Sequence, residues 1–224
     1  MPIMVNEIDE NVILTLDNES FFEIKTYRIS KELEKVILNA LETILEKGGR
    51  SEIQPLIYTV VKELTINACK ANQKRVFFEE KGYDITNQED YEIGIIEYKA
   101  TFSETMGSEY GPKSKLRGYY CLIRLEYNNE GITITVTNNT PIAKPEEKAI
   151  REKLAIAMGY DDLAQFYMDN ADNTEGAGLG LALIIIMLKG EGLDPNFFRI
   201  SISEGTTQAR LEIPMGISFK SKRT

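Results

Sequence analysis

The sequence predicts a fold that mixes α-helices and β-strands, an α/β or α+β class. Paired segments that alternate apolar and polar residues around turn residues indicate β-hairpins. Longer segments with apolar residues at three- and four-residue spacing indicate helices. The chain has 224 residues, 42% of them hydrophobic, which suits one sizeable core. We therefore expect one domain with an insertion, and not two large domains.

The first 50 residues are predicted to form two strands and a helix, either part of the main domain or packed on it. The strands are VILTL and FFEIKTYRI, separated by a turn at 17–19. Ser30 is expected to cap the helix, and Gly48 and Gly49 to end it. The regular apolar stripe of this helix fits either a place in the core or the seam of a homodimer.

The main domain is expected to span 51–214. Ser51 and Gln54 are predicted to form a capping box for a helix that runs to about Arg75. The segment 79–118 is interpreted as an insertion, helical from about 91 to 102 and then a loop at GSEYGPKSKLRG.

Two further hairpins and three helical segments are predicted after the insertion. The first hairpin pairs YYCLIRLEY with GITITVT, and the second pairs FFRISIS with QARLEIP around Gly205. A helix is expected at about 145–158, a shorter segment after it that ends at 169, and another helix at about 179–189. The stretch between 142 and 175 leaves room for a mobile lid. The basic tail 215–224 is interpreted as a solvated end.

Composition excludes several classes of function. The formal net charge is -9, which argues against nucleic acid as the main partner because phosphate binding needs concentrated Lys and Arg. The longest apolar run is 181–188, too short to cross a membrane, and the acidic start does not resemble a signal peptide. We therefore expect a cytoplasmic protein. Cys69 and Cys121 are expected to be buried free thiols, and not disulfide partners or metal ligands.

The chain contains no histidine. Catalysis by Ser-His-Asp or Cys-His groups is therefore excluded, as are histidine-containing zinc sites and a phosphohistidine formed within this chain. Any chemistry must use carboxylates, amides, lysines, hydroxyls or a metal ion held by oxygen ligands.

Polar residues of the helix after Ser51 gather beside its apolar stripe. At about 100° per residue, Glu63, Asn67, Lys70 and Lys74 fall within about 60° of one another, along the edge of the core. Such a stripe is usually a half-solvated flank with i, i+4 pairs. The chemical alternative is an amide oxygen for Mg²⁺, a carboxylate that accepts a proton, and a lysine that neutralises phosphate.

A second informative stretch is TEGAGLGLALIIIML, with glycines at 176, 178 and 180 before an apolar helix. Glycines allow close approach of a ligand to the backbone, and the start of a helix favours phosphate. Standing alone, the motif is more simply a flexible turn into a buried helix. It lacks the GK[ST] of a Walker A loop, and no hydrophobic strand precedes it as in a dinucleotide fingerprint.

Taken in order, these motifs resemble the GHKL ATP-binding family of gyrase, the large heat-shock chaperone, sensor histidine kinases and mismatch-repair ATPases. ELTINACKA resembles its N box, VTNNTPI and EGAGLGLAL its two glycine boxes, and SEGTTQARLEIP its closing box. The NAxK and GxGLGL elements are most similar to those of histidine kinases and anti-sigma-factor kinases. The resemblance spans about 53–214, except for the insertion.

The resemblance implies a Bergerat-type ATP-binding fold, a two-layer sandwich in which helices cover one face of a mixed β-sheet. It implies ATP and Mg²⁺ as cofactors. Glu63 would be the general base or would orient water, Asn67 would ligate Mg²⁺, and Lys70 would approach the phosphates. The phosphates would be wrapped by Gly176, Gly178 and Gly180, with Leu179 and Leu181 packed behind these glycines. The adenine would lie near Asn138 and Thr207.

The sequence departs from the family at the first glycine box. Asn138, Asn139, Thr140 and Pro141 replace an aspartate that reads the adenine amino group and two glycines. An asparagine oxygen can accept the same hydrogen bond, but without a charge assistance of about 1 kcal/mol. The sequence alone therefore predicts that Asn138→Asp strengthens ATP binding. The closing box also has Gln208 where an aromatic residue is common.

Two functional hypotheses follow. The first is a kinase in signal transduction that transfers the γ-phosphoryl group of ATP to a partner protein, on histidine or, as in anti-sigma-factor kinases, on serine or threonine. The second is a non-catalytic module that binds nucleotide weakly or not at all and regulates a partner. Retention of Glu63, Asn67 and the glycines favours the first, and loss of the adenine-reading aspartate favours the second.

Overall fold

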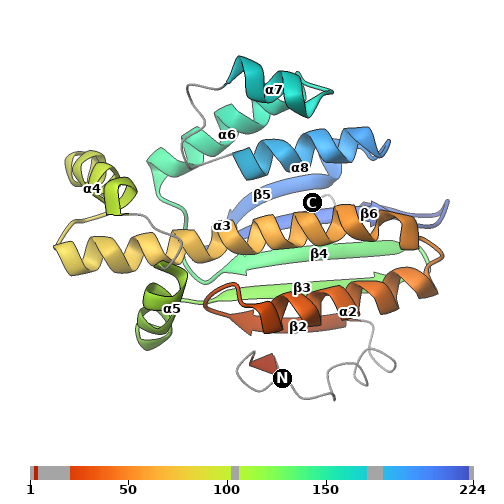
Figure 1. Ribbon diagram of the computed structural model, residues 1–224, viewed down its shortest axis with the longest axis horizontal. Coiled ribbons are helices and arrows are strands. Elements are labelled where there is room, and N and C mark those ends of the chain that lie inside the picture. The colour runs from red at the N-terminus through yellow and green to blue at the C-terminus, as the bar shows by residue number, and fades with distance from the viewer. Residues whose placement is uncertain (1–2, 5–20, 102–105, 171–178, 222–224) are drawn as a thin grey trace.

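The computed structural model describes residues 3–4, 21–101, 106–170 and 179–221. These residues form two layers, a β-sheet and a set of helices packed over one of its faces (Figure 1). The chain is therefore an α+β sandwich, as predicted.

The described strands form one six-stranded sheet in the order β1-β2-β3-β4-β6-β5. Strand β1 is only two residues long and runs parallel to β2, and the other pairs are antiparallel, so the sheet is mixed. Both predicted hairpins are present, as β3 with β4 and β5 with β6. The predicted strand at 12–16 and turn at 17–19 lie outside the described residues. The strands are β1 (Ile3–Met4), β2 (Phe21–Thr26), β3 (Cys121–Asn128), β4 (Gly131–Asn138), β5 (Phe198–Ser203) and β6 (Thr206–Pro214).

Helices α2, α3 and α8 lie over the sheet, and α6 and α7 continue the layer beyond α8 (Figure 1). Helices α4 and α5 lie beside the far end of α3, away from the other helices. Short 3₁₀ turns precede α3 and β5, at Ser51–Ile53 and Pro195–Phe197. The helices are α2 (Lys31–Lys47), α3 (Gln54–Lys81), α4 (Gln88–Thr101), α5 (Met106–Leu116), α6 (Lys144–Met158), α7 (Leu163–Asp169) and α8 (Leu179–Gly190).

The main core lies between the sheet and its helices. Strand residues that alternate toward this face, such as Ile123 and Leu125, are fully buried against α3 residues such as Ile57 and Val60. Burial of each large apolar side chain contributes roughly 1.5–3 kcal/mol. The apolar stripe of α2, left open between core and dimer seam by the sequence, belongs to this core.

One predicted helix start is correct and one is wrong. The Ser30 hydroxyl accepts from the N–H of Leu33 at 3.2 Å and caps α2, as predicted. The capping box at Ser51 does not form, because Ser51 begins a 3₁₀ turn without a side-chain cap. Helix α3 starts at Gln54, followed by Pro55, whose missing N–H costs nothing in a first turn.

Helix α3 is longer than predicted, running six residues beyond Arg75 to Lys81 before Gly82 ends it in a left-handed conformation. The extension is stabilised by a second small core that the insertion supplies. Phe77 and Phe78 of α3 are buried there beside Tyr98 of α4 and Tyr110 of α5. The insertion is thus a helical pair wrapped around the end of α3.

The segment predicted as a loop after α4 is mostly helix α5, although it contains Gly111 and Pro112. Tyr110 is buried against the end of α3, and Lys113 pairs with Glu80 of α3 at 3.1 Å. These tertiary contacts outweigh the poor helix propensity of the segment.

The basic tail returns to the sheet as far as the structure describes it. The N–H of Met215 donates to the carbonyl of Glu130 at 2.8 Å, and the Ser221 hydroxyl donates to Glu212. The described part of the tail is therefore anchored to the sheet at these two points, and Ile217 and Lys220 between them are exposed, as expected of a solvated end. No helix among the described residues has the length and apolar character needed to span a membrane.

Candidate functional site

The polar stripe occupies the middle of α3 at the border of the core. Glu63, Asn67, Lys70 and Lys74 are all half-buried, whereas their apolar neighbour Leu64 is 3% exposed. The stripe therefore lies at the boundary between the core and solvent, as its spacing predicted.

The start of α8 packs directly on Glu63 and Asn67. A Cβ at Gly180 would lie 2.3 Å from a carboxylate oxygen of Glu63 and 3.5 Å from the amide nitrogen of Asn67. Any side chain at position 180 would displace the Glu63 carboxylate. The structure thus joins two motifs more than 110 residues apart, and glycine is required by close packing and not by an unusual backbone angle.

Asn67 is poised to use its side-chain oxygen. Its amide nitrogen is buried without a hydrogen-bond partner among the described residues. Because the nitrogen is the buried end, the oxygen is the end that a ligand can reach. A neutral amide oxygen is a ligand of the kind that Mg²⁺ accepts, so this side chain fits the metal that the sequence implies.

No group of three or more acidic, cysteine or histidine residues that could hold a metal lies within the described residues. A magnesium ion at Asn67 would therefore need most of its ligands from water or from a bound phosphate.

The two lysines of the stripe differ in their surroundings. Lys74 forms an ion pair with Glu146 of α6, in which both side chains are largely buried. The backbone carbonyl of Lys70 accepts from the Tyr98 hydroxyl of α4 at 3.4 Å. Lys74 is thus structural, and the insertion contacts the stripe at Lys70.

Glu146 and Arg75 join α3 to the segment that leads into α6. Burial raises the pKa of Glu146, but the charge of Lys74, its hydrogen bond and the charge of Arg75 together hold that pKa below its ordinary value. Arg75 donates to the carbonyls of Ala71 and Pro141, and burial lowers its pKa. The segment that leads into α6, where the expected lid would begin, is therefore held to α3 by buried charged groups.

A polar cluster lies at the end of β4. The side-chain nitrogen of Asn138 donates to the carbonyl of Ala68 at 3.0 Å and to the side-chain oxygen of Asn72 at 3.3 Å. The Thr140 hydroxyl also reaches Asn72, at 3.4 Å, and the Thr207 hydroxyl donates to the carbonyl of Thr140 at 2.9 Å. Asn138 and Thr207, expected together near adenine, are brought together beside α3.

The orientation of the Asn138 amide follows from this cluster. A carbonyl oxygen such as that of Ala68 can only accept, so the Asn138 NH₂ group must face α3. The side-chain oxygen then remains as the atom that could accept from a ligand. Asn138 itself is only 6% exposed, so a ligand could reach it only at its edge.

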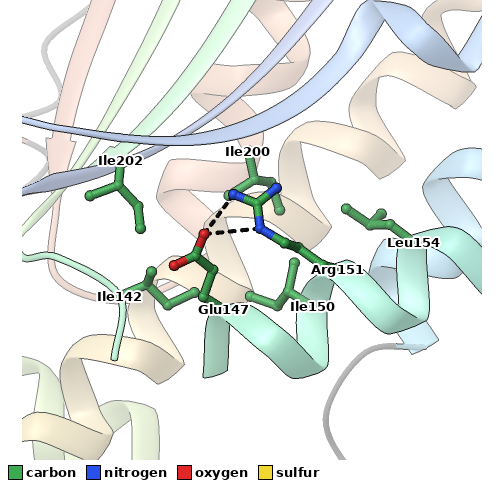
Figure 2. Close-up of a pocket in the computed structure, with 7 residues that line it drawn as sticks. All are labelled: Ile142, Glu147, Ile150, Arg151, Leu154, Ile200 and Ile202. Atoms are coloured by element: carbon green, nitrogen blue, oxygen red, sulfur yellow. Dashed lines mark hydrogen bonds and ion pairs between the residues drawn. The ribbon is translucent and has the colours of Figure 1, made fainter. Parts of the chain in front are cut away.

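An apolar hollow adjoins the cluster, between α6 and the edge strand β5 (Figure 2). Ile142 follows Thr140 by two residues, and Ile202 pairs with Thr207 in the sheet register. The hollow is shallow, because its volume of about 20 Å³ is far below the roughly 300 Å³ of a small-molecule pocket. Its lining residues are Ile142, Glu147, Ile150, Arg151, Leu154, Ile200 and Ile202.

The lining of the hollow is mainly apolar. Five of its seven lining residues are isoleucine or leucine, and Glu147 pairs with Arg151 at 2.6 Å along one side. These residues carry no signal in the sequence, because isoleucines in a helix and a strand have the same pattern as ordinary core residues.

The remaining expected residues are only partly described. Gly176 and Gly178 lie outside the described residues, as does the side chain of Leu179, although Leu179 begins α8. Leu181 is 5% exposed and belongs to the main core, in keeping with its expected packing role.

Comparisons with known proteins give one relative. No protein-family model matches the sequence, and no solved structure matches the fold. The chain is 31% identical over 201 residues to an uncharacterized protein of Treponema pallidum (strain Nichols). The match covers 90% of this chain and 39% of the relative, so the chain corresponds to about two fifths of that protein's length.

Proposed function

We propose that this chain is an ATP-binding protein of the GHKL type that transfers the γ-phosphoryl group of ATP to a partner protein. One observation carries the proposal: the segments that resemble the family's boxes converge on one site. Gly180 of the second glycine box touches Glu63 and Asn67, while Asn138 and Thr207 lie beside the next turn of α3. Chance resemblance in sequence would not require this convergence.

The proposed nucleotide extends from the end of β4 toward the start of α8. The adenine ring would lie beside the end of β4, with its amino group toward Asn138. Asn138 is hydrogen-bonded to Ala68, the residue after Asn67. Adenine-binding and metal-binding groups are thus close along α3, which suits a single nucleotide.

Each stripe residue has a distinct proposed role. The Asn67 oxygen would hold Mg²⁺, which when bound neutralises charge on the phosphates. Glu63 has no ion pair or hydrogen bond among the described residues, so its carboxylate can accept a proton from an attacking hydroxyl. Lys70 would approach the phosphates. Positioning and charge neutralisation supply most of the rate in such transfers.

The phosphoryl acceptor is proposed to lie on another protein in the cytoplasm. With no histidine among these 224 residues, a phosphohistidine cannot form within them. The acceptor would be a serine, threonine or histidine of the partner.

A regulatory module without catalysis is the second candidate. The burial of Asn138 favours it, since the side chain that would read adenine is only 6% exposed. The segment from Asn138 to Pro141 also lacks the two glycines of the family's first glycine box.

Labelling with [γ-³²P]ATP tests the transfer. Incubated alone, the chain should gain no phosphohistidine and hydrolyse ATP slowly. Added to an extract of its source organism, it should label one protein, and Glu63→Ala should abolish this label. Glu42→Ala, at an exposed position of α2, is the matched control and should leave the label intact.

The acid stability of the label identifies the acceptor, because phosphoserine and phosphothreonine survive acid and phosphohistidine does not. If ATP occupies the site and no protein is labelled, the kinase proposal is wrong and the regulatory module replaces it.

A further inference from the structure

Strand β5 is an edge of the sheet and has a neighbouring strand, β6, on only one side among the described residues. A two-residue turn with positive φ angles at both residues joins β5 to β6. The residues that flank such a turn, Ser203 and Thr206, form a hydrogen-bonded pair, and such pairs recur at every second residue of the ladder. The backbone groups of Ile200 and Ile202 therefore point away from β6, toward the open edge.

These backbone groups are available to another strand. Within the part of the chain that the structure describes, no backbone hydrogen bond outside the helices and strand ladders involves Ile200 or Ile202. Ile202 is also 43% exposed. Proteins protect open edges with charged residues, proline or bulges. Strand β5, with the sequence FRISIS, has no proline and a single charged residue, Arg199, so its edge is poorly protected.

The hollow beside β5 gives this edge a preference for apolar side chains. Ile200 and Ile202 line it from the strand, and Ile150 and Leu154 line it from α6 (Figure 2). Its volume of about 20 Å³ exceeds the roughly 10–15 Å³ that one water molecule needs, so it can take the tip of one aliphatic side chain. Directly opposite residues of paired strands share a face, so residues opposite Ile200 and Ile202 would point toward the hollow.

The other face of β5 gives the edge a preference for an acidic residue. Arg199 lies directly opposite Arg210 of β6, and like charges in this arrangement destabilise a sheet. Arg210 pairs with Glu212 at 3.5 Å, whereas no ion pair between described residues includes Arg199. A carboxylate on an added strand, opposite Arg199 at the open edge, would supply the missing partner.

A second copy of this chain suits the edge less well than a single extended peptide. Strand β5 contains no acidic residue that could pair with Arg199 of another copy. Helix α6 lies along this edge on the helix side of the sheet (Figures 1 and 2). Two β5 strands paired about a two-fold axis would bring both α6 helices over the same junction.

We propose that the groove between β5 and α6 binds an extended segment of a partner protein, which adds to the sheet as a further strand. In an antiparallel arrangement the segment carries an aliphatic residue opposite Ile202, any residue, an aliphatic residue opposite Ile200 and an acidic residue opposite Arg199, in that order. Main-chain hydrogen bonds supply affinity, and the hollow and Arg199 supply specificity. This interaction does not depend on nucleotide binding.

Selection of phage-displayed random decapeptides against the chain, without nucleotide, tests the groove. The enriched peptides should share the aliphatic, any, aliphatic, acidic order, and one of them is then synthesised for fluorescence anisotropy. Methylation of the backbone nitrogens of its two aliphatic residues should abolish binding, because these N–H groups face β5. Methylation of the nitrogen between them should leave most of the affinity.

Ile202→Pro should weaken the peptide at least roughly tenfold. The proline removes an N–H that faces the open edge, so the ladder with β6 is retained. Ile217→Pro is the matched control, because Ile217 is fully exposed at the first central position of a turn, where proline is favoured. Arg199→Gln should weaken the peptide roughly five- to tenfold at low salt, and not a peptide with glutamine in place of the acidic residue.

The outcomes are decisive without reference to ATP. The proposal is wrong if selection enriches no peptide over the Ile202→Pro protein, or if the two methylated peptides bind equally well. It is also wrong if sedimentation shows a dimer of the wild type that Ile202→Pro dissociates, because a second copy then occupies the edge. Melting temperatures of both proline variants within a few degrees of the wild type would show that lost binding does not reflect unfolding. Peptide binding in a chain that never binds ATP would leave this proposal standing and overturn only the proposed function.

Discussion

Glu146→Ala is expected to lower the free energy of unfolding by about 3 kcal/mol or more, because it leaves the Lys74 ammonium without its partner in a largely buried site. It also removes the acceptor for the N–H of Ala143, 3.2 Å away, at the start of α6. Urea unfolding at pH 7 measures the effect. Glu147→Ala is the matched control: its partner Arg151 is exposed, so the loss should be below about 1 kcal/mol.

The same variant has a defined pH dependence. The pKa of Glu146 is lower in the folded protein than its ordinary value, so its charge stabilises the fold above the unfolded pKa of about 4.3. That contribution is lost as the pH falls through the lower, folded-state pKa. The difference in unfolding free energy between wild type and Glu146→Ala should therefore shrink below about pH 4. Equal effects of Glu146→Ala and Glu147→Ala at pH 7 would show that the buried pair does not tie α6 to α3.

Asn138→Asp is expected to destabilise the fold by about 2–4 kcal/mol at pH 7, in contrast to the gain in ATP binding that the sequence alone predicts. The side-chain nitrogen donates to two oxygens, of Ala68 and Asn72. A carboxylate there would lose both hydrogen bonds and face both acceptors while 6% exposed. Rotation of the Asn72 amide could relieve only one of the two, because the Ala68 carbonyl cannot donate.

Asn128→Asp makes the same chemical change at a position where a carboxylate can form the same hydrogen bonds. The Asn128 oxygen accepts from the N–H groups of Glu130 and Gly131 in the hairpin turn, and aspartate can do the same. This control should unfold at nearly the wild-type urea midpoint. An Asn138→Asp protein as stable as this control would mean that the amide nitrogen does not face α3.

The predictable parts of the fold are those whose signal is local. The apolar period of α2, the Ser30 cap and the turn residues of both hairpins lie within a few positions of the elements they define. The end of α3 and the helix around Pro112 were not predictable in this way. Their stability comes from aromatic contacts among α3, α4 and α5, which single-segment propensity cannot register.

The candidate site likewise contains residues whose positions the sequence predicts and contacts that it does not predict. Glu63 and Asn67 share a helix face, so their spacing alone placed them together. The partner of Lys74 is 72 positions away, and nothing near Lys74 in the chain distinguishes it from Lys70.

Magnesium-dependent binding of ATP tests the central claim most directly. In thermal and urea unfolding, ATP with Mg²⁺ at a hundredfold excess over its dissociation constant should stabilise the wild type by about 2.7 kcal/mol. Asn67→Ala should lose the magnesium-dependent part of this gain. Asn39→Ala, at an exposed position of α2, should keep it. Stabilisation that is absent in the wild type, or identical in Asn67→Ala, would contradict an ATP–magnesium site at Asn67.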